Sequence, residues 1–161
     1  MLWCLTLNKS LELVEPNANL SKAYQEKGAK ALETMREITD KEWKISAAYY
    51  SMYFSLYAIL QKTGIKCENH TCSIEFAKVF LTEYFTSPEL TLISDSMQAR
   101  VDSQYYTNRE VSEITIAEMI KQAPLFWVKC RGVVDKLDEK KVQKIRDNFR
   151  KFMKKEKETG L

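Results

Sequence analysis

The chain has 161 residues, of which 45% are apolar and 29% are charged, an ordinary composition for one globular domain. Only four glycines and three prolines leave few sites for tight turns, which favours a mostly helical fold. A net charge of +3 is too small to indicate nucleic-acid binding by bulk electrostatics. The sequence shows neither a secretory signal nor an apolar run of the ~20 residues that a membrane helix needs, so a cytoplasmic location without membrane contact is expected.

The four cysteines are Cys4, Cys67, Cys72 and Cys130. Without a secretory signal they are expected to be reduced and partly buried. Cys67, His70 and Cys72 are close enough in sequence to suggest a fragment of a metal site. A structural zinc site needs a further ligand, which Cys4 or Cys130 would have to supply from a distance. No metal and no cofactor is therefore predicted.

The N-terminal part predicts an arm followed by a first helix. Residues 1–16 are expected to form the arm, either as a short helix or as an extended segment. Asn17 or Asn19 is a suitable N-cap for the first helix, which is predicted to run to about Ile38 on the spacing of its apolar residues.

The second helix is predicted over residues 41–63, between an Asp40 N-cap and a left-handed stop at Gly64. Its apolar positions form a stripe too wide for one neighbour, so it is expected to be central and to contact neighbours on two sides. Tyrosines are concentrated on it, in the segment SAAYYSMYFSLYAIL that begins at Ser46.

Three further helices are expected before the basic C-terminal segment. The third is predicted over residues 71–85 and the fourth over residues 89–108. A capping-box pair of Thr115 and Glu118 predicts the start of the fifth, and Pro124 is expected to kink or break it.

Residues 138–161 form a basic amphipathic segment that keeps the helical apolar spacing. It is expected either to extend the preceding helix or to fold back on the bundle. The prediction is a single all-α domain over residues 1–161. Residues 17–137 form an antiparallel bundle of about five helices, and residues 138–161 form a basic C-terminal helix.

Arg100 begins the polar and aromatic run Arg-Val-Asp-Ser-Gln-Tyr-Tyr. On a helix, Asp102, Gln104, Tyr105 and Tyr106 lie on faces next to this arginine. A guanidinium with phenols and an amide nearby is suited to bind a phosphate while a ring stacks on a base. The alternative is an ion pair inside the bundle, with Asp102 or a glutamate as the partner.

His70 is the only histidine in the chain and lies near a predicted helix N-terminus. It is a candidate base for a ribose hydroxyl, with Arg100 stabilising the phosphate, although one histidine rarely acts as both general acid and general base. The alternative is that His70 or Asn69 simply caps the helix, with the imidazole in solvent. The tyrosines of residues 41–63 are candidates to line a base-stacking pocket: Tyr49, Tyr50, Tyr53 and Tyr57, of which Tyr50 and Tyr53 are candidate ligand contacts. Aromatic residues at helical spacing more often pack in a core or a dimer interface.

The segment Ala-Ala-Tyr-Tyr-Ser-Met-Tyr from Ala47, the later Gly64 and the histidine at the mouth of the next helix resemble the HEPN family. This name stands for higher eukaryote and prokaryote nucleotide-binding domains. The resemblance covers about residues 20–137 and is to the small stand-alone prokaryotic members. It implies an antiparallel helical bundle, a homodimer, and in many members a nucleotidyltransferase partner within a toxin–antitoxin system.

Some HEPN proteins are metal-independent endoribonucleases, whose signature is an arginine followed a few residues later on the same helix by a histidine. Counted from Arg100, the histidine positions of that signature hold Tyr105, Tyr106 and Thr107 in this chain. The arginine therefore carries over and the histidine does not. His70 matches a different family position, at the start of the third helix.

The missing histidine favours binding over catalysis. The leading hypothesis is a dimeric module that binds a nucleotide or an RNA phosphate, or that docks a nucleotidyltransferase chain. One alternative is a metal-independent endoribonuclease that uses Arg100 with His70 or a tyrosine. The second alternative is a non-catalytic helical scaffold, for which Arg100 would be buried in an ion pair.

Overall fold

The computed structural model describes residues 1–6 and 10–158. Its elements are, in chain order, α1 (Leu2–Thr6), β1 (Glu12–Leu13), α2 (Ala18–Glu37), α3 (Lys41–Thr63), β2 (Ile65–Lys66), α4 (His70–Phe80), α5 (Ser87–Tyr105), α6 (Glu113–Lys136) and α7 (Glu139–Glu158). The predicted all-α class is confirmed. The two strands form one small antiparallel sheet, in which Glu12 pairs with Lys66.

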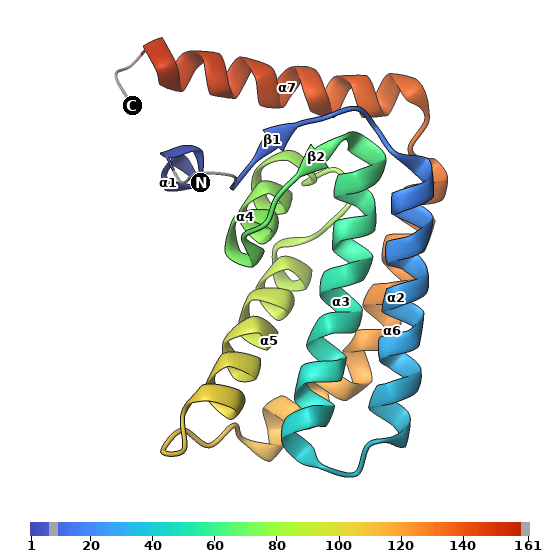
Figure 1. Cartoon of the computed structure of the whole chain (residues 1–161), viewed down its shortest axis with the longest axis vertical. Coiled ribbons are helices and arrows are strands. Elements are labelled where there is room, and N and C mark those ends of the chain that lie inside the picture. The colour runs from blue at the N-terminus through green and yellow to red at the C-terminus, as the bar shows by residue number, and fades with distance from the viewer. Residues whose placement is uncertain (7–9, 159–161) are drawn as a thin grey trace.

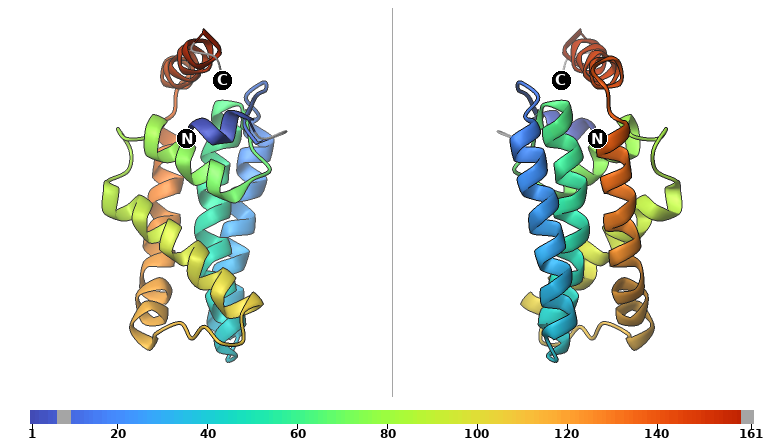
Figure 2. Two further views of the ribbon diagram at one scale, coloured as in Figure 1. Left: turned by 90° about the vertical axis from the view of Figure 1, so that its left-hand side faces the viewer. Right: turned by 90° about the vertical axis from the view of Figure 1, so that its right-hand side faces the viewer.

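Helix α3 is the centre of the bundle, with α2, α5 and α6 packed along it (Figures 1 and 2). It is buried on opposite sides: Tyr49, Ala58 and Leu60 are each 0% exposed, and Ala58 lies about half a turn around the helix from the other two. The prediction that this helix contacts neighbours on two sides is confirmed. A helix that is apolar over most of its circumference has to be covered by several others, which explains its position.

The ends of α2 and α3 follow local capping chemistry. The side chain of Asn17 accepts a hydrogen bond from the Leu20 N–H at 2.9 Å, and Asp40 accepts one from Trp43 at 3.0 Å. Gly64 ends α3 in the left-handed region, with φ 70°. Asp40 and Gly64 are the cap residues that the sequence predicts, and of the two asparagines considered, Asn17 is the N-cap.

The boundary between α4 and α5 differs from the prediction. Helix α4 ends at Phe80, well before the predicted end at Phe85, although the apolar spacing continues between them. Helix α5 begins at Ser87, because Thr86 and Glu89 form a capping box there. The apolar residues after Phe80 pack in a turn rather than on a longer helix.

The start of α6 also differs from the prediction. Its N-cap is Ser112, whose hydroxyl accepts a hydrogen bond from the Thr115 N–H at 3.1 Å. The predicted capping box of Thr115 and Glu118 is therefore wrong, and Glu118 instead accepts a bond from Gln122. The helix continues through Pro124 without a break. A proline removes a single N–H donor, and packing on both sides of it can hold the helix together.

Helix α7 turns away after Leu137 and lies across the end of the bundle at which α3 ends (Figure 1). Of the two arrangements considered, folding back on the bundle is the one observed. Its apolar stripe is buried, and Val142, Ile145 and Phe149 are at most 9% exposed. The Phe149 ring packs edge-on against the Phe76 ring, with centroids 5.3 Å apart.

Arg146 fixes α7 to the end of α3 and to the N-terminal arm. Its Nη1 donates to the carbonyl oxygens of Val14 at 2.6 Å, Thr63 at 3.0 Å and Gly64 at 3.1 Å. The side chain is 6% exposed. The Thr63 and Gly64 carbonyl groups lie at the C-terminal end of α3, where a cation is favoured by the helix dipole.

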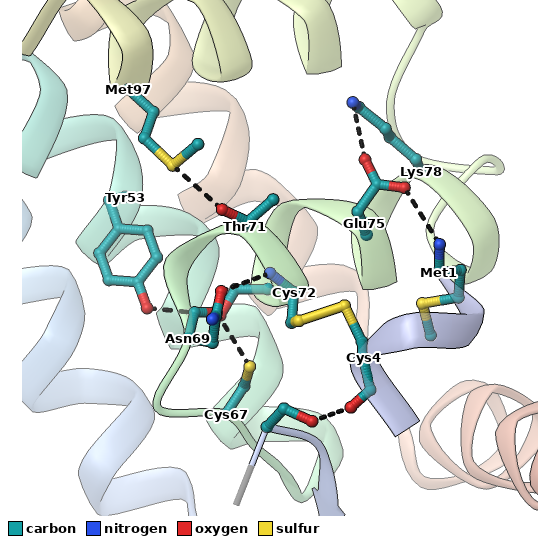
Figure 3. The surroundings of a disulfide bond; sticks show 12 residues. Met1, Cys4, Tyr53, Cys67, Asn69, Thr71, Cys72, Glu75, Lys78 and Met97 are labelled. Atoms are coloured by element: carbon teal, nitrogen blue, oxygen red, sulfur yellow. Dashed lines mark hydrogen bonds and ion pairs between the residues drawn. A yellow bond between two sulfur atoms is a disulfide. The ribbon is translucent and has the colours of Figure 1, made fainter. Parts of the chain in front are cut away.

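Cys4 in α1 and Cys72 in α4 form a disulfide, with their Cα atoms 5.6 Å apart (Figure 3). The prediction that the cysteines are reduced is therefore wrong for this pair. Cys67 and Cys130 are free and buried. The two bridged residues are separated by 68 positions. Only the fold brings them together, so sequence spacing gives no sign of the pairing.

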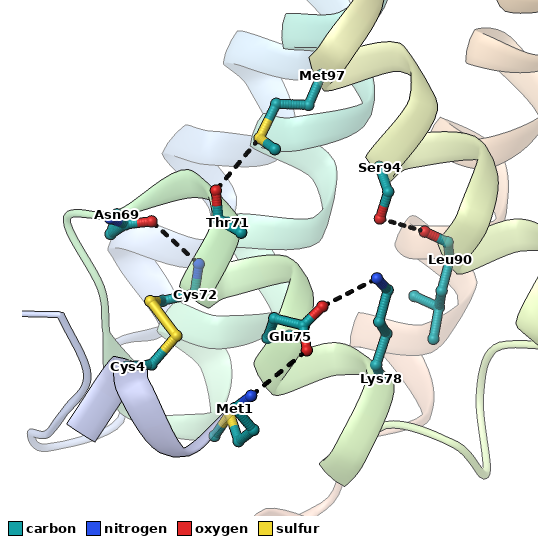
Figure 4. Close-up of polar contacts among 10 residues, drawn as sticks. All are labelled: Met1, Cys4, Asn69, Thr71, Cys72, Glu75, Lys78, Leu90, Ser94 and Met97. Atoms are coloured by element: carbon teal, nitrogen blue, oxygen red, sulfur yellow. Dashed lines mark hydrogen bonds and ion pairs between the residues drawn. A yellow bond between two sulfur atoms is a disulfide. The ribbon is translucent and has the colours of Figure 1, made fainter. Parts of the chain in front are cut away.

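Helix α4 is also fixed by polar contacts on either side of the disulfide (Figure 4). The amino group of Met1 pairs with the Glu75 carboxylate at 3.7 Å, and Lys78 pairs with the same side chain at 2.9 Å. The Thr71 hydroxyl donates to the Met97 sulfur of α5 at 3.8 Å. The N-terminal half of α4 is thereby held from both α1 and α5.

Two further findings concern the part of the chain that the structure describes. None of its helices has the length and the apolar character that crossing a membrane requires. Its His, Cys, Asp and Glu side chains form no group of three or more that could hold a metal ion. Cys72, one member of the suggested metal fragment, is bound to Cys4 instead.

Candidate functional site

His70 is the first residue of α4, directly after its N-cap Asn69. Its ring stacks on that of Tyr53 from α3, with centroids 3.8 Å apart and an interplanar angle of 19°. Its Nδ1 lies 2.7 Å from the hydroxyl of Tyr49, one helical turn before Tyr53. The imidazole is thus held by two tyrosines from one face of α3, and its orientation is set by that helix.

Both members of the Tyr49–His70 pair are neutral near pH 7. Burial lowers the pKa of His70, and the positive charge of Arg100 lowers it further. Burial raises the pKa of Tyr49 well above its ordinary value. Two proton arrangements fit the 2.7 Å contact: either the Tyr49 hydroxyl donates to Nδ1, or Nδ1–H donates to the Tyr49 oxygen.

Arg100 reaches α3 from α5. Its Nη2 donates to the hydroxyl of Tyr50 at 3.1 Å and to that of Tyr105 at 3.4 Å. The guanidinium carbon lies 5.5 Å and 5.2 Å from the centres of the same two rings. Among the residues that the structure describes, no carboxylate forms an ion pair with Arg100, and its buried Nε has no acceptor. The positive charge is therefore held by neutral oxygens and aromatic rings.

Tyr50 joins the two halves of the site. Its hydroxyl accepts from Arg100, and its ring meets the His70 ring edge-on with centroids 6.2 Å apart. Because Tyr50 contacts both side chains, the cation and the imidazole lie within electrostatic reach of each other, and the charge of Arg100 lowers the pKa of His70. We refer to the side chains of Tyr49, Tyr50, Tyr53, His70, Arg100 and Tyr105 as the Tyr50 cluster.

Three of the predicted site residues lie outside the Tyr50 cluster. Asp102 accepts from Gln98 at 2.9 Å and pairs with Arg109 at 2.8 Å, so it is not the partner of Arg100. The Arg109 guanidinium lies 3.8 Å from the centre of the Tyr106 ring. Gln104 lines a groove on the side of Tyr50 that faces α2.

Tyr53 belongs to the Tyr50 cluster but has a supporting position. It is 5% exposed, and its hydroxyl lies 3.3 Å from the hydroxyl of Ser73. A ligand contact, as predicted for Tyr53, would require the His70 ring to move. Its ring sets the plane of the imidazole instead.

Sequence reasoning missed the role of one residue of functional interest and the whole of another. Tyr49 is among the tyrosines considered for a base-stacking pocket, but its hydrogen bond to His70 was not foreseen, and its spacing of one turn from Tyr53 is the signal for it. Arg109 follows the end of α5 and forms an ion pair with Asp102, so that Asp102 does not pair with Arg100. No local pattern indicates that contact, because it depends on how the chain turns after Tyr105.

The comparisons with known proteins give no family for this chain. No family model matches the sequence, and no curated protein is significantly similar to it. The HEPN resemblance stays a prediction, and the function of this chain is inferred from the geometry of the Tyr50 cluster.

Proposed function

We propose that this chain is a HEPN-like helical module that binds the phosphate of a nucleotide or of RNA at Arg100. The observation that carries the proposal is a half-buried guanidinium that has phenol oxygens and no carboxylate as partners, and whose Nε has no acceptor. An arginine donates in a planar fork that matches two oxygens of a phosphate. The anion would supply the charged acceptor that the guanidinium lacks.

The surrounding residues support phosphate binding in different ways. Tyr50 orients the guanidinium, so little side-chain freedom is lost when an anion binds. Tyr105 is 67% exposed and offers a ring on which a base can stack. His70 adds a hydrogen bond from Nε2 if the Tyr49 hydroxyl donates to Nδ1, because the imidazole proton is then on Nε2.

In this proposal the module acts as a homodimer together with a nucleotidyltransferase chain, as in a toxin–antitoxin pair, and it does so in the cytoplasm. These partners follow from the sequence resemblance alone, and the location is the one expected from the sequence. The Cys4–Cys72 disulfide weighs against a strongly reducing compartment, in which such bonds are uncommon.

Binding to a fluorescently labelled RNA pool tests the proposal. Arg100→Met removes the charge and the donors and keeps much of the apolar stem. We expect it to weaken binding about tenfold or more, because hydrogen bonds to a charged group are worth about 1.5–3 kcal/mol. Arg131→Met is the matched control, since Arg131 is exposed on α6 and has no contact with the Tyr50 cluster. Equal binding by both variants, or no binding by folded wild-type protein, would contradict the proposal.

A second candidate function is a metal-independent endoribonuclease. The observation that favours it is a neutral imidazole in the same cluster as the guanidinium, with Tyr50 in contact with both. If Nδ1–H donates to Tyr49, Nε2 is free to take a proton from a ribose hydroxyl. A single histidine leaves the leaving group without an obvious acid, which is why binding is preferred.

Cleavage of a mixed RNA pool in EDTA separates the two functions. The binding module predicts no cleavage by wild-type protein. The ribonuclease predicts cleavage that is lost in both Arg100→Ala and His70→Ala proteins. The scaffold hypothesis expects Arg100 in a buried ion pair, and none is formed within the described residues.

A further inference from the structure

A groove of about 620 Å³ runs over α2 and α3 beside the Tyr50 cluster. Its lining includes the rings of Trp43, Tyr50 and Phe54, and Trp43 is 61% exposed. A large ring with that much exposed surface is unusual on a helix that is otherwise buried. The groove therefore presents aromatic faces to the outside.

The charged side chains that line the groove are two lysines and one glutamate. Lys27 and Lys30 from α2 line it, against one carboxylate, Glu26. The Lys27 ammonium lies 5.6 Å from the centre of the Phe54 ring, so charge and aromatic surface are interleaved. This combination is typical of surfaces that follow a phosphate backbone and stack its bases.

Ser46 adds a polar group whose hydrogen-bonding capacity is unused. It lines the groove and is 4% exposed, and its Oγ has no hydrogen-bond partner among the described residues. A buried hydroxyl without a partner costs free energy, so a partner supplied by a ligand would be favourable. The edge of a base or a ribose hydroxyl offers such a partner.

The groove is continuous with the phosphate site. Tyr50 lines the groove with its ring and accepts from Arg100 with its hydroxyl. Gln104, one helical turn after Arg100 on α5, also lines the groove. A phosphate held at Arg100 therefore places the base or the nucleotide attached to it at the mouth of the groove.

We propose that the groove binds unpaired bases next to the phosphate at Arg100, so that the ligand is single-stranded RNA. This inference rests on the proposed function and adds the ligand class to it. The bases of a duplex are stacked and paired, and they cannot turn their faces toward Trp43, Tyr50 and Phe54. Lys27 and Lys30 neutralise the neighbouring phosphates of the strand.

Three labelled RNAs of one length provide the test: a single strand, the same sequence as a duplex, and a strand in which abasic residues replace the central bases. We expect wild-type protein to bind the single strand about tenfold more tightly than either of the others, since base stacking on aromatic side chains is sequence-tolerant and strong. Trp43→Ala should weaken single-strand binding about tenfold. Lys27→Ala should weaken it less and should reduce its dependence on salt.

Leu125→Ala is the matched control. Leu125 is 58% exposed on α6 and does not line the groove. It should bind all three RNAs as the wild type does. Because Trp43 and Leu125 are both more exposed than buried, neither substitution should prevent folding.

The outcomes separate the inference from the function on which it rests. Equal binding of the single strand and the duplex, or an unaffected Trp43→Ala protein when Arg100→Met binds weakly, overturns the inference and leaves the phosphate site standing. A Trp43→Ala protein that changes its oligomeric state shows that a second copy covers the groove, which also overturns the inference. No binding of any RNA by wild-type protein overturns the proposed function itself.

Discussion

His70 is the only histidine in the chain, so its proton reports on the Tyr50 cluster without interference from other imidazoles. Two effects act on it. Burial against the rings of Tyr49 and Tyr53 disfavours the charged form, and the guanidinium of Arg100 disfavours it further. The pKa of this residue therefore measures whether Arg100 and His70 share one site.

An NMR titration of the imidazole protons provides that measurement. We expect the wild-type pKa to lie below the ordinary value of 6.5. Arg100→Met should raise it toward 6.5, because the repulsive charge is removed and the burial remains. Binding of inorganic phosphate should also raise it, since the anion offsets the guanidinium charge. The control Arg131→Met should leave the titration unchanged. An unchanged pKa of His70 in the Arg100→Met protein would show that His70 and Arg100 do not share one site.

The end of α3 illustrates how one element positions several others. Gly64 has φ 70°, and a Cβ at this position would lie 2.4 Å from the Val14 carbonyl oxygen and against the Arg146 side chain. Glycine is required there both for the left-handed backbone and for the close approach of Arg146. The same arginine then holds α7 across the end of the bundle.

Removing that arginine should loosen α7 and lower stability. Arg146→Met removes the side-chain donor of three carbonyl oxygens at the α3 end and in the N-terminal arm, of which only the Gly64 oxygen keeps a backbone donor, the Val14 N–H, among the bonds described at this junction. We expect the free energy of unfolding in urea to fall by about 2–4 kcal/mol, since unsatisfied buried groups cost about 1–3 kcal/mol each and water replaces some of the lost bonds. Hydrogen exchange should become faster in α7 in particular.

Arg150→Met is the control, on the same helix one turn later. Its side chain is 46% exposed and pairs with Asp147, an exposed i,i+3 contact that contributes little. Its free energy of unfolding should stay within about 0.5 kcal/mol of the wild type. Similar losses in the two variants would show that the carbonyl contacts of Arg146 are not what secures α7.

Local signals in the sequence predict where the helices begin and end better than they predict the contacts between helices. Asp40 and Gly64 define α3 in the sequence as they do in the structure, because caps act on their own backbone. The end of α4 was misplaced because apolar residues up to Phe85 keep helical spacing, and the Thr86–Glu89 capping box that opens α5 was overlooked. Apolar spacing alone does not separate a buried turn from a continuing helix.

In the candidate site, too, single residues are predicted from the sequence but their contacts are not. Arg100 and His70 are recognisable in the sequence as residues suited to phosphate binding and acid–base chemistry, and both belong to the Tyr50 cluster. The roles of Tyr49 and Tyr50 depend on contacts across 21 and 50 positions, respectively. Such contacts follow from how helices pack and are not encoded in local spacing.

At the scale of the whole molecule, the Cys4–Cys72 disulfide connects the N-terminal arm to the helix that carries His70. Cys72 lies two residues after His70, so the bridge is near the Tyr50 cluster, of which Figure 3 shows Tyr53. Without it, α1 would be held to α4 by Met1 and Glu75 and by apolar packing. The bridge therefore links the folding of the arm to the order of the site.

The double variant Cys4→Ser/Cys72→Ser should lose about 2–4 kcal/mol in the free energy of unfolding, because the bridge closes a long loop and restricts the unfolded chain. Adding a reductant should lower the free energy of unfolding of the wild type to about that of the variant, and it should leave the variant unaffected. Thiol titration of the unfolded, unreduced protein should detect only Cys67 and Cys130. Detection of all four thiols would exclude the bridge. If the pKa of His70 also rises toward 6.5 in the variant, the bridge orders the Tyr50 cluster as well as the arm, since a looser α4 exposes the imidazole to water.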